Sequence, residues 1–150
     1  MSELRELYKE VILDHNKAPR NFRVIDDADL VKEGNNPLCG DKVTVYLKLS
    51  DGVITDISFQ GSGCAISKSS ASIMTASLKG KTEQEAERIF QSFHGMVTGE
   101  SATPQDEEVL GKLAVFAGVR EFPVRVKCAT LAWHTMHAAI NQKTAAVTTE

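Results

Sequence analysis

Three cysteines and one aspartate are the residues whose types and positions suit chemistry in this sequence. Cys39 lies in the stretch NNPLCGD with a glycine after it, and Asp41 follows two residues later. Cys64 comes directly after GSG, and Cys128 comes directly after FPVRVK. Each cysteine falls at a break in the apolar pattern and not inside a buried stripe. The thiolate is the form of cysteine that binds metals and attacks sulfur, so these positions are candidates for both roles.

Cys64 and Cys128 are both predicted to open helices. The free amides and the positive dipole end of a helix start stabilise a thiolate, whereas a buried structural cysteine gains nothing there. Asp41 would add a carboxylate to three sulfurs, and four such donors suit zinc or an iron–sulfur centre. The alternative is that the cysteines are unrelated small apolar side chains, as cysteine often is. No CxxC pair is present, so spacing alone leaves both interpretations open.

The first half of the chain predicts a helix followed by strands. Residues 3–14 repeat apolar side chains at helical spacing, and residues 29–34 suit a short edge strand. Residues 42–49 and 53–59 alternate apolar and polar side chains, and the turn-forming residues SDG lie between them. This pattern predicts an antiparallel hairpin.

The second half of the chain predicts mainly helices. They are expected over residues 64–79, after a capping box at Thr82 and Glu85, over residues 103–117 and over residues 128–141. Residues 122–127 are predicted to be extended because they contain Pro123. The tail, residues 143–150, has little to bury and is predicted to be frayed. Strands early and helices later indicate one α+β domain over residues 1–150, a small antiparallel sheet with helices packed on one face.

Composition narrows the possible functions. The chain has 150 residues, 42% hydrophobic and 25% charged, with a net charge of −3 and no basic block, which argues against nucleic acid. The amino terminus carries charges throughout, and no apolar run approaches the roughly 18 residues that span a membrane. We therefore expect a cytoplasmic protein that does not bind membranes. An odd number of widely spaced cysteines favours reduced thiols over a disulfide framework.

Three stretches carry a resemblance to a known family: NNPLCGD, GSGCAISKSSASIMT and FPVRVKCATLAWHT. Over roughly residues 3–142 the chain resembles the U-type iron–sulfur cluster assembly proteins, the IscU/SufU/NifU amino-terminal family. The resemblance implies a compact IscU/SufU-like α+β fold in which the cysteine segments meet at one end. It also implies that Cys39, Asp41, Cys64 and Cys128 bind a metal.

Two features of the sequence resemble the SufU branch more than the scaffold IscU branch. IscU proteins carry a histidine immediately before the third cysteine, and this chain has Lys127 there. SufU proteins carry an insertion before the third cysteine, which the helix expected at 103–117 resembles. The SufU resemblance implies Zn²⁺ in the site and a SufS-type cysteine desulfurase as sulfur donor. The alternative is an iron or [2Fe–2S] cluster site in an IscU-type scaffold.

The expected reaction is attack by a thiolate on the outer sulfur of an enzyme persulfide. Cys39 is the predicted catalytic acceptor because it lies on a glycine-flanked segment, where release of Asp41 by a partner side chain would free it. Cys128 is the rival acceptor. Arg125 matches an arginine of the SufU motif and is the candidate residue for binding the desulfurase, with a solvated surface role as its alternative. Downstream assembly proteins would receive the sulfur.

A binding module with a purely structural metal is the third possible function. It is disfavoured because structural sites prefer closed thiolate or imidazole ligation, and a carboxylate ligand is more readily exchanged. His134 and His137 share a helix face but point away from Cys128 at the expected helical spacing. We therefore predict surface or packing roles for these two histidines.

Overall fold

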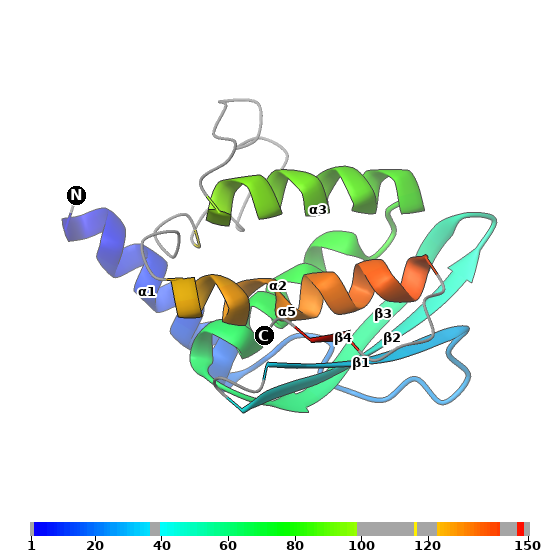
Figure 1. The fold of residues 1–150 in the computed structure, drawn as a ribbon, viewed down its shortest axis with the longest axis horizontal. Coiled ribbons are helices and arrows are strands. Elements are labelled where there is room, and N and C mark those ends of the chain that lie inside the picture. The colour runs from blue at the N-terminus through cyan, green and yellow to red at the C-terminus, as the bar shows by residue number, and fades with distance from the viewer. Residues whose placement is uncertain (1, 37–39, 99–115, 117–122, 142–146, 149–150) are drawn as a thin grey trace.

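The structure is a computed structural model that describes residues 2–36, 40–98, 116, 123–141 and 147–148. Its helices are α1 (Ser2–Lys17), α2 (Ala65–Leu78), α3 (Glu83–Thr98) and α5 (Pro123–Ile140), and its strands are β1 (Leu30–Asn36), β2 (Asp41–Ser50), β3 (Val53–Ser62) and β4 (Val147–Thr148). The strands form one sheet in the order β3-β2-β1-β4. Helices α2, α3 and α5 lie on one face of this sheet (Figure 1), which confirms the predicted α+β fold class.

The hairpin of β2 and β3 forms where the sequence predicts it. Asp51 and Gly52 connect the two strands with φ of 51° and 78°. Positive φ at both central residues gives a turn whose twist matches that of the flanking strands. The predicted strand at 29–34 is also present: β1 pairs antiparallel with β2 and runs two residues further than expected, to Asn36. It is not an edge strand, because β4 pairs with its other side.

Strand β2 alternates between a buried and a more exposed face. Val43, Val45 and Leu47 are buried in the core that the helices cover. Because side chains two residues apart lie on the same face of a strand, Asp41 at the start of β2 shares this buried face. The carboxylate is therefore directed towards the helices and not into solvent.

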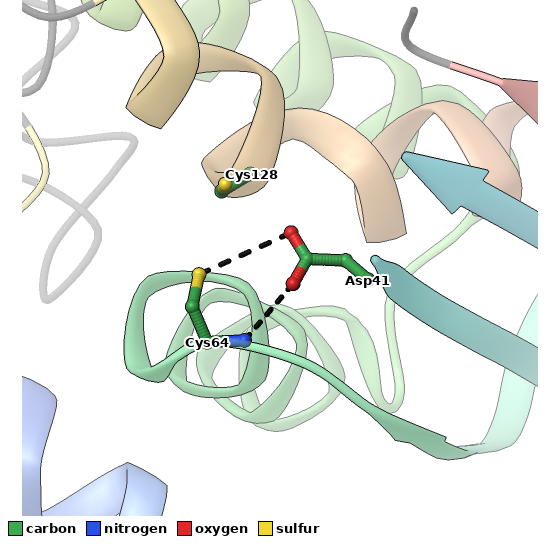
Figure 2. Close-up of side chains that lie close together, drawn as sticks. All are labelled: Asp41, Cys64 and Cys128. Atoms are coloured by element: carbon green, nitrogen blue, oxygen red, sulfur yellow. Dashed lines mark hydrogen bonds between the residues drawn. The ribbon is translucent and has the colours of Figure 1, made fainter. Parts of the chain in front are cut away.

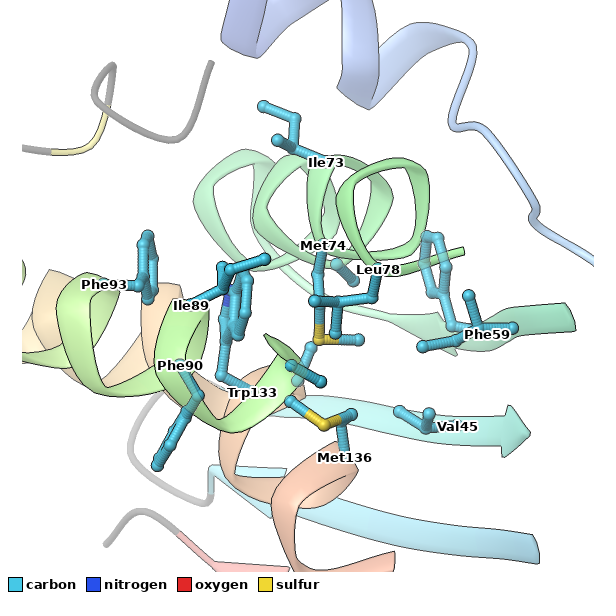
Figure 3. Close-up of a cluster of buried hydrophobic side chains, with 14 of the residues drawn as sticks. Val45, Phe59, Ile73, Met74, Leu78, Ile89, Phe90, Phe93, Trp133 and Met136 are labelled. Carbon is cyan, nitrogen blue, oxygen red and sulfur yellow. The ribbon is translucent and has the colours of Figure 1, made fainter. Parts of the chain in front are cut away.

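Helices α2 and α5 pack closely through small side chains. The Ser70 hydroxyl donates to the carbonyl of Ala129 at 2.5 Å and accepts from the indole N–H of Trp133 at 3.2 Å. Both polar groups are buried and satisfied, so they do not weaken the contact. Figure 3 shows Trp133 in the apolar cluster between the sheet and the helices. The small side chain of Ser70 therefore allows α2 and α5 to pack closely.

Helix α3 begins with the predicted capping box. The Thr82 hydroxyl accepts from the Glu85 N–H at 3.0 Å, and the Glu85 carboxylate accepts from the Thr82 N–H at 3.1 Å. The predicted apolar face packs on α5, where Phe93 stacks on Trp133 with ring centroids 4.7 Å apart. Burying aromatic side chains of this size contributes about 2–3 kcal/mol each.

The last helix begins earlier than the sequence pattern suggests. Residues 122–127 were expected to be extended, but α5 starts at Pro123. Proline suits the first turn of a helix, because its φ is already helical and its missing N–H needs no partner there. The alternation of Val124 and Val126 with charged residues resembles a strand, yet Val124 is exposed and Val126 packs on the core from a helix.

Phe116 and strand β4 are the described parts of the segments that precede and follow α5. The helix expected at 103–117 lies outside the described residues, except that Phe116 is buried against Phe93. The prediction of a frayed tail is wrong for Val147–Thr148, which pair with Gly34 and Asn35 of β1 as a short parallel strand. On the side away from β2, the backbone N–H and C=O groups of β1 need partners. Hydrogen bonds to these groups favour the pairing with β4, although the tail has little apolar surface to bury. None of the helices in the described part of the chain is long and apolar enough to cross a membrane.

Candidate metal centre

Three of the four predicted ligands meet at one end of the sheet. A carboxylate oxygen of Asp41 and the sulfurs of Cys64 and Cys128 all lie within 4.8 Å of one another. They come from the start of β2, the residue before α2 and the second turn of α5, and Figure 2 shows them facing one another. Cys39, the fourth predicted ligand, lies outside the described residues, and its role stays a prediction. Among the described residues, this is the group of ligand-type side chains close enough to share a metal ion.

Asp41 is fully buried and is fixed by the segment before α2. Its Oδ1 accepts the backbone N–H of Cys64 at 2.9 Å, and its Oδ2 lies 3.9 Å from the Cys64 sulfur. Gly63 makes this approach possible, because a Cβ on residue 63 would come within 2.5 Å of Oδ1. Gly63, the second glycine of GSG, therefore leaves room for the Asp41 carboxylate because it has no side chain.

The donor set fits a metal cation. Within the described ranges, Asp41 forms no ion pair with a lysine, arginine or histidine. Removing a carboxylate from water is costly unless a cation or strong donors compensate for it. A carboxylate with two thiols suits zinc or iron, since both accept mixed oxygen and sulfur ligation.

Cys64 is the N-cap of α2, as the sequence predicts. Its backbone is extended, with φ of −72° and ψ of 168°, and its sulfur accepts the Ser67 N–H at 3.4 Å. A helix start supplies partial positive charge that favours a thiolate. Cys64 is exposed, so its sulfur is the more accessible of the two that the structure describes.

Cys128 has a different setting from the one predicted. Because α5 begins at Pro123, Cys128 lies in the second turn and not at the helix start. The stabilisation by a helix N-terminus falls off within the first turn, so it does not explain this cysteine. Cys128 is only 2% exposed, and the side-chain amide of Asn36 lies 3.8 Å from its sulfur. The sulfur of Cys128 therefore lies in a buried contact between α5 and β1 and not at a helix start.

Asn36 was not singled out from the sequence. It lies in the same NNPLCGD stretch as Cys39 and Asp41, but its contact with Cys128 joins residues 92 positions apart. Its position in a cysteine-containing stretch was the only local signal. The close approach of α5 to β1 creates the contact.

Arg125 is exposed and lies one helical turn before Cys128. In the extended segment expected at 122–127, residues three apart would lie on opposite faces. Residues three apart in a helix share a side, so Arg125 lies on the side of α5 that carries Cys128. The side chain therefore emerges on the same side of α5 as the candidate metal centre.

The histidines of α3 and α5 form a separate group around Phe90. His137 stacks on the Phe90 ring with centroids 4.6 Å apart, and the rings of His94 and His134 lie 5.4 Å from each other. His137 also pairs with Glu87 at 2.7 Å. Burial, together with the neighbouring His94 and His137, lowers the pKa of His134 to about 4. These contacts agree with the packing roles predicted for His134 and His137.

The fold and the buried carboxylate–thiol group are those of an α+β protein with a candidate metal site, and the comparisons identify its family. The model of the NifU-like N terminal domain matches residues 7–129, and the chain belongs to this family. This confirms the resemblance to the U-type iron–sulfur cluster assembly proteins.

Relatives with different functional names are equally similar to the chain. It is 40% identical over 139 residues to the zinc-dependent sulfurtransferase SufU of Bacillus subtilis, covering 93% of this chain and 92% of the relative. It is also 40% identical over 142 residues to the iron–sulfur cluster assembly scaffold protein IscU of Streptococcus pyogenes, covering 95% and 87%. Among solved structures, the SUF-system scaffold protein FiSufU of Fervidobacterium islandicum superposes with a TM-score of 0.82 at 38% identity, covering 87% of this chain and 94% of that one.

Proposed function

We propose that this protein accepts sulfur from a SufS-type cysteine desulfurase at a zinc-bound cysteine and passes it into iron–sulfur cluster assembly. The observation that carries the proposal is the buried Asp41 carboxylate beside the sulfurs of Cys64 and Cys128. The similarity to the zinc-dependent sulfurtransferase SufU over nearly the whole chain supports it further.

Asp41, Cys64, Cys128 and Cys39 would hold the zinc. When bound, zinc keeps its thiolate ligands deprotonated and joins the segments that carry them. Asp41 is the most readily exchanged member of this set, because a carboxylate binds zinc less strongly than thiolates do. Its hydrogen bond from the Cys64 N–H gives the carboxylate a fixed position in the fold.

The transfer step is a thiol–disulfide type of exchange. The Cys39 thiolate attacks the outer sulfur of the desulfurase persulfide, a new S–S bond forms, and the S–S bond of the donor breaks. The donor cysteine leaves as a thiolate, and Cys39 carries the persulfide, so no external oxidant or reductant is needed. Burial of Cys128 disfavours it as the acceptor, since a persulfide on another protein must reach the attacking sulfur.

Arg125 would contribute to docking of the desulfurase. Its exposed side chain lies one turn from Cys128, on the same side of α5 as the candidate metal centre. A guanidinium there could pair with a carboxylate of the partner at the rim of the contact.

A scaffold function is the second candidate, because IscU-named relatives match the chain as closely as SufU does. Lys127 takes the place of the histidine that precedes the third cysteine in IscU proteins, so one ligand and proton acceptor expected of a [2Fe–2S] site is missing. A carboxylate ligand also disfavours a purely structural metal.

The deciding experiment combines metal content with desulfurase turnover. Protein purified without oxygen should be colourless with one zinc and should raise cysteine turnover by a SufS-type desulfurase. Cys39→Ser should abolish the stimulation but leave binding of the desulfurase intact, because a serine hydroxyl is almost wholly protonated at neutral pH. Mass spectrometry should find one added sulfur atom on the Cys39 peptide. Brown protein containing iron and sulfide, with no stimulation, would support the scaffold function instead.

A further inference from the structure

Asn36 is a buried polar residue that contacts the candidate metal centre from the end of β1. It is fully buried and pairs with Asp41 in the β1–β2 register. Its carbonyl accepts the N–H of Gly40, the residue before Asp41, at 2.9 Å. Its side-chain N–H donates to the Cys128 sulfur at 3.8 Å. One residue thus lies beside Asp41 and contacts Cys128.

We propose that Asn36 is a positioning residue whose hydrogen bond keeps Cys128 as a metal ligand. Cys128 is then a poor sulfur acceptor, so sulfur transfer is directed to another cysteine of the site. This inference rests on the proposed function, because it assigns different tasks to cysteines of the same site. A hydrogen bond to a thiolate withdraws electron density from the sulfur and makes it a weaker nucleophile. Groups that orient metal ligands in this way commonly tune both affinity and reactivity.

The two described sulfurs differ in their surroundings. Cys64 is exposed and accepts the backbone N–H of Ser67 at the start of α2, where water competes for the same hydrogen bond. Cys128 is 2% exposed and accepts a hydrogen bond from the buried amide of Asn36. Electrostatic interactions are stronger in such low-dielectric surroundings, so the Asn36 hydrogen bond restrains Cys128 more than Ser67 restrains Cys64.

The hydrogen bond itself can be tested without any metal. In metal-free protein, Cys128→Ala should shift the side-chain amide resonances of Asn36 in ¹H–¹⁵N spectra. Cys64→Ala is the matched control, because it removes the neighbouring sulfur that Asn36 does not contact, and it should leave those resonances in place. Equal shifts in both variants, or no shift in either, would overturn the contact.

The effect on reactivity is tested with Asn36→Leu, which keeps the branched shape and the number of heavy atoms but removes the donor. Asn35→Leu is the control, since Asn35 is the neighbouring residue of β1, where side chains alternate between the two faces, and it is only partly buried. In zinc-loaded protein, the alkylation rate of Cys128 relative to Cys64 should rise about threefold, because a thiolate that loses a hydrogen bond is a stronger nucleophile. Zinc affinity should fall by about tenfold. The cobalt(II)-substituted protein should show its sulfur-to-metal charge-transfer band at lower energy.

These readouts separate a hydrogen-bonding role from simple packing. Asn36→Ser, which keeps a donor but reduces volume, should restore part of the cobalt spectrum and serves if Asn36→Leu does not fold. A cobalt spectrum and an alkylation ratio identical to those of the parent would overturn the proposal. None of these measurements uses a desulfurase, so failure of sulfur transfer would remove the proposed function and leave the Asn36–Cys128 interaction separately tested.

Discussion

The carboxylate of Asp41 accepts the backbone N–H of Cys64 at 2.9 Å, which joins the first residue of β2 to the N-cap of α2. This hydrogen bond fixes the carboxylate beside a sulfur through the fold itself. A hydrogen bond of this kind needs only an oxygen acceptor. The structural role of residue 41 can therefore be tested separately from its proposed role as an anionic metal ligand.

Substitution of Asp41 should therefore have graded effects. Asp41→Asn keeps an oxygen for the Cys64 N–H but loses the charge, whereas Asp41→Ala loses both. We expect both variants to fold and to release zinc to a chromogenic chelator faster than the parent, with Asp41→Ala the faster of the two. Release rates indistinguishable from the parent would remove Asp41 from the ligand set.

Cys64→Ser should lower zinc stoichiometry and the melting temperature of the zinc-loaded protein together. Metal that binds only the native state adds its binding free energy to stability. Serine is itself a favoured N-cap, so the melting temperature of metal-free protein should stay close to that of the metal-free parent. Elemental analysis and thermal unfolding with and without chelator check this prediction. Unchanged metal content in the variant would contradict a site shared by Cys64.

Gly63→Ala should disrupt the site although residue 63 is not a ligand. The added Cβ would lie 2.5 Å from Oδ1 of Asp41, so either the carboxylate or the segment before α2 must move. We expect weaker zinc binding, measured by chelator competition. Ser62→Ala is the control, since Ser62 is an exposed neighbour. Equal zinc affinity in the Gly63 variant and the control would show that this close approach is not required.

His134 should make the metal-free protein less stable in acid. Its folded pKa of about 4 lies below the ordinary value of 6.5, so the unfolded chain binds more protons between these values. The stabilising contribution is present above pH 6.5 and is lost as the pH falls towards 4. At pH 5 the loss of unfolding free energy amounts to about 2 kcal/mol. Urea unfolding at pH 7 and pH 5 measures it.

The control for the pH effect is His134→Phe, which keeps an aromatic ring against Phe90 but cannot be protonated. The loss of unfolding free energy between pH 7 and pH 5 should be smaller in this variant than in the parent. His94, His137 and Glu87 remain in place and account for the pH dependence that persists. The same loss in variant and parent would assign the effect to other groups.

Local chemistry was enough to predict much of the architecture. The turn at Asp51 and Gly52, the capping box at Thr82 and Glu85, and the N-cap at Cys64 each depend on interactions within a few residues. Their geometry follows from residue type and spacing, so the hairpin and the starts of α2 and α3 are where the sequence predicts them. The same holds for the buried face of β2, because strand alternation directs Asp41 towards the helices.

Tertiary packing decided the features that depend on distant residues. Pro123 and the valines after it suit either a helix start or an extended segment, and packing of α5 against α2 and the sheet selects the helix. That choice moves Cys128 into the second turn and brings Arg125 to the same side of the helix. The contact of Asn36 with Cys128 exists only because α5 lies across β1, where Gly34 lets Thr135 approach the strand backbone. The sequence alone determined which side chains could bind a metal, whereas the environment of each sulfur depended on which helices and strands pack together.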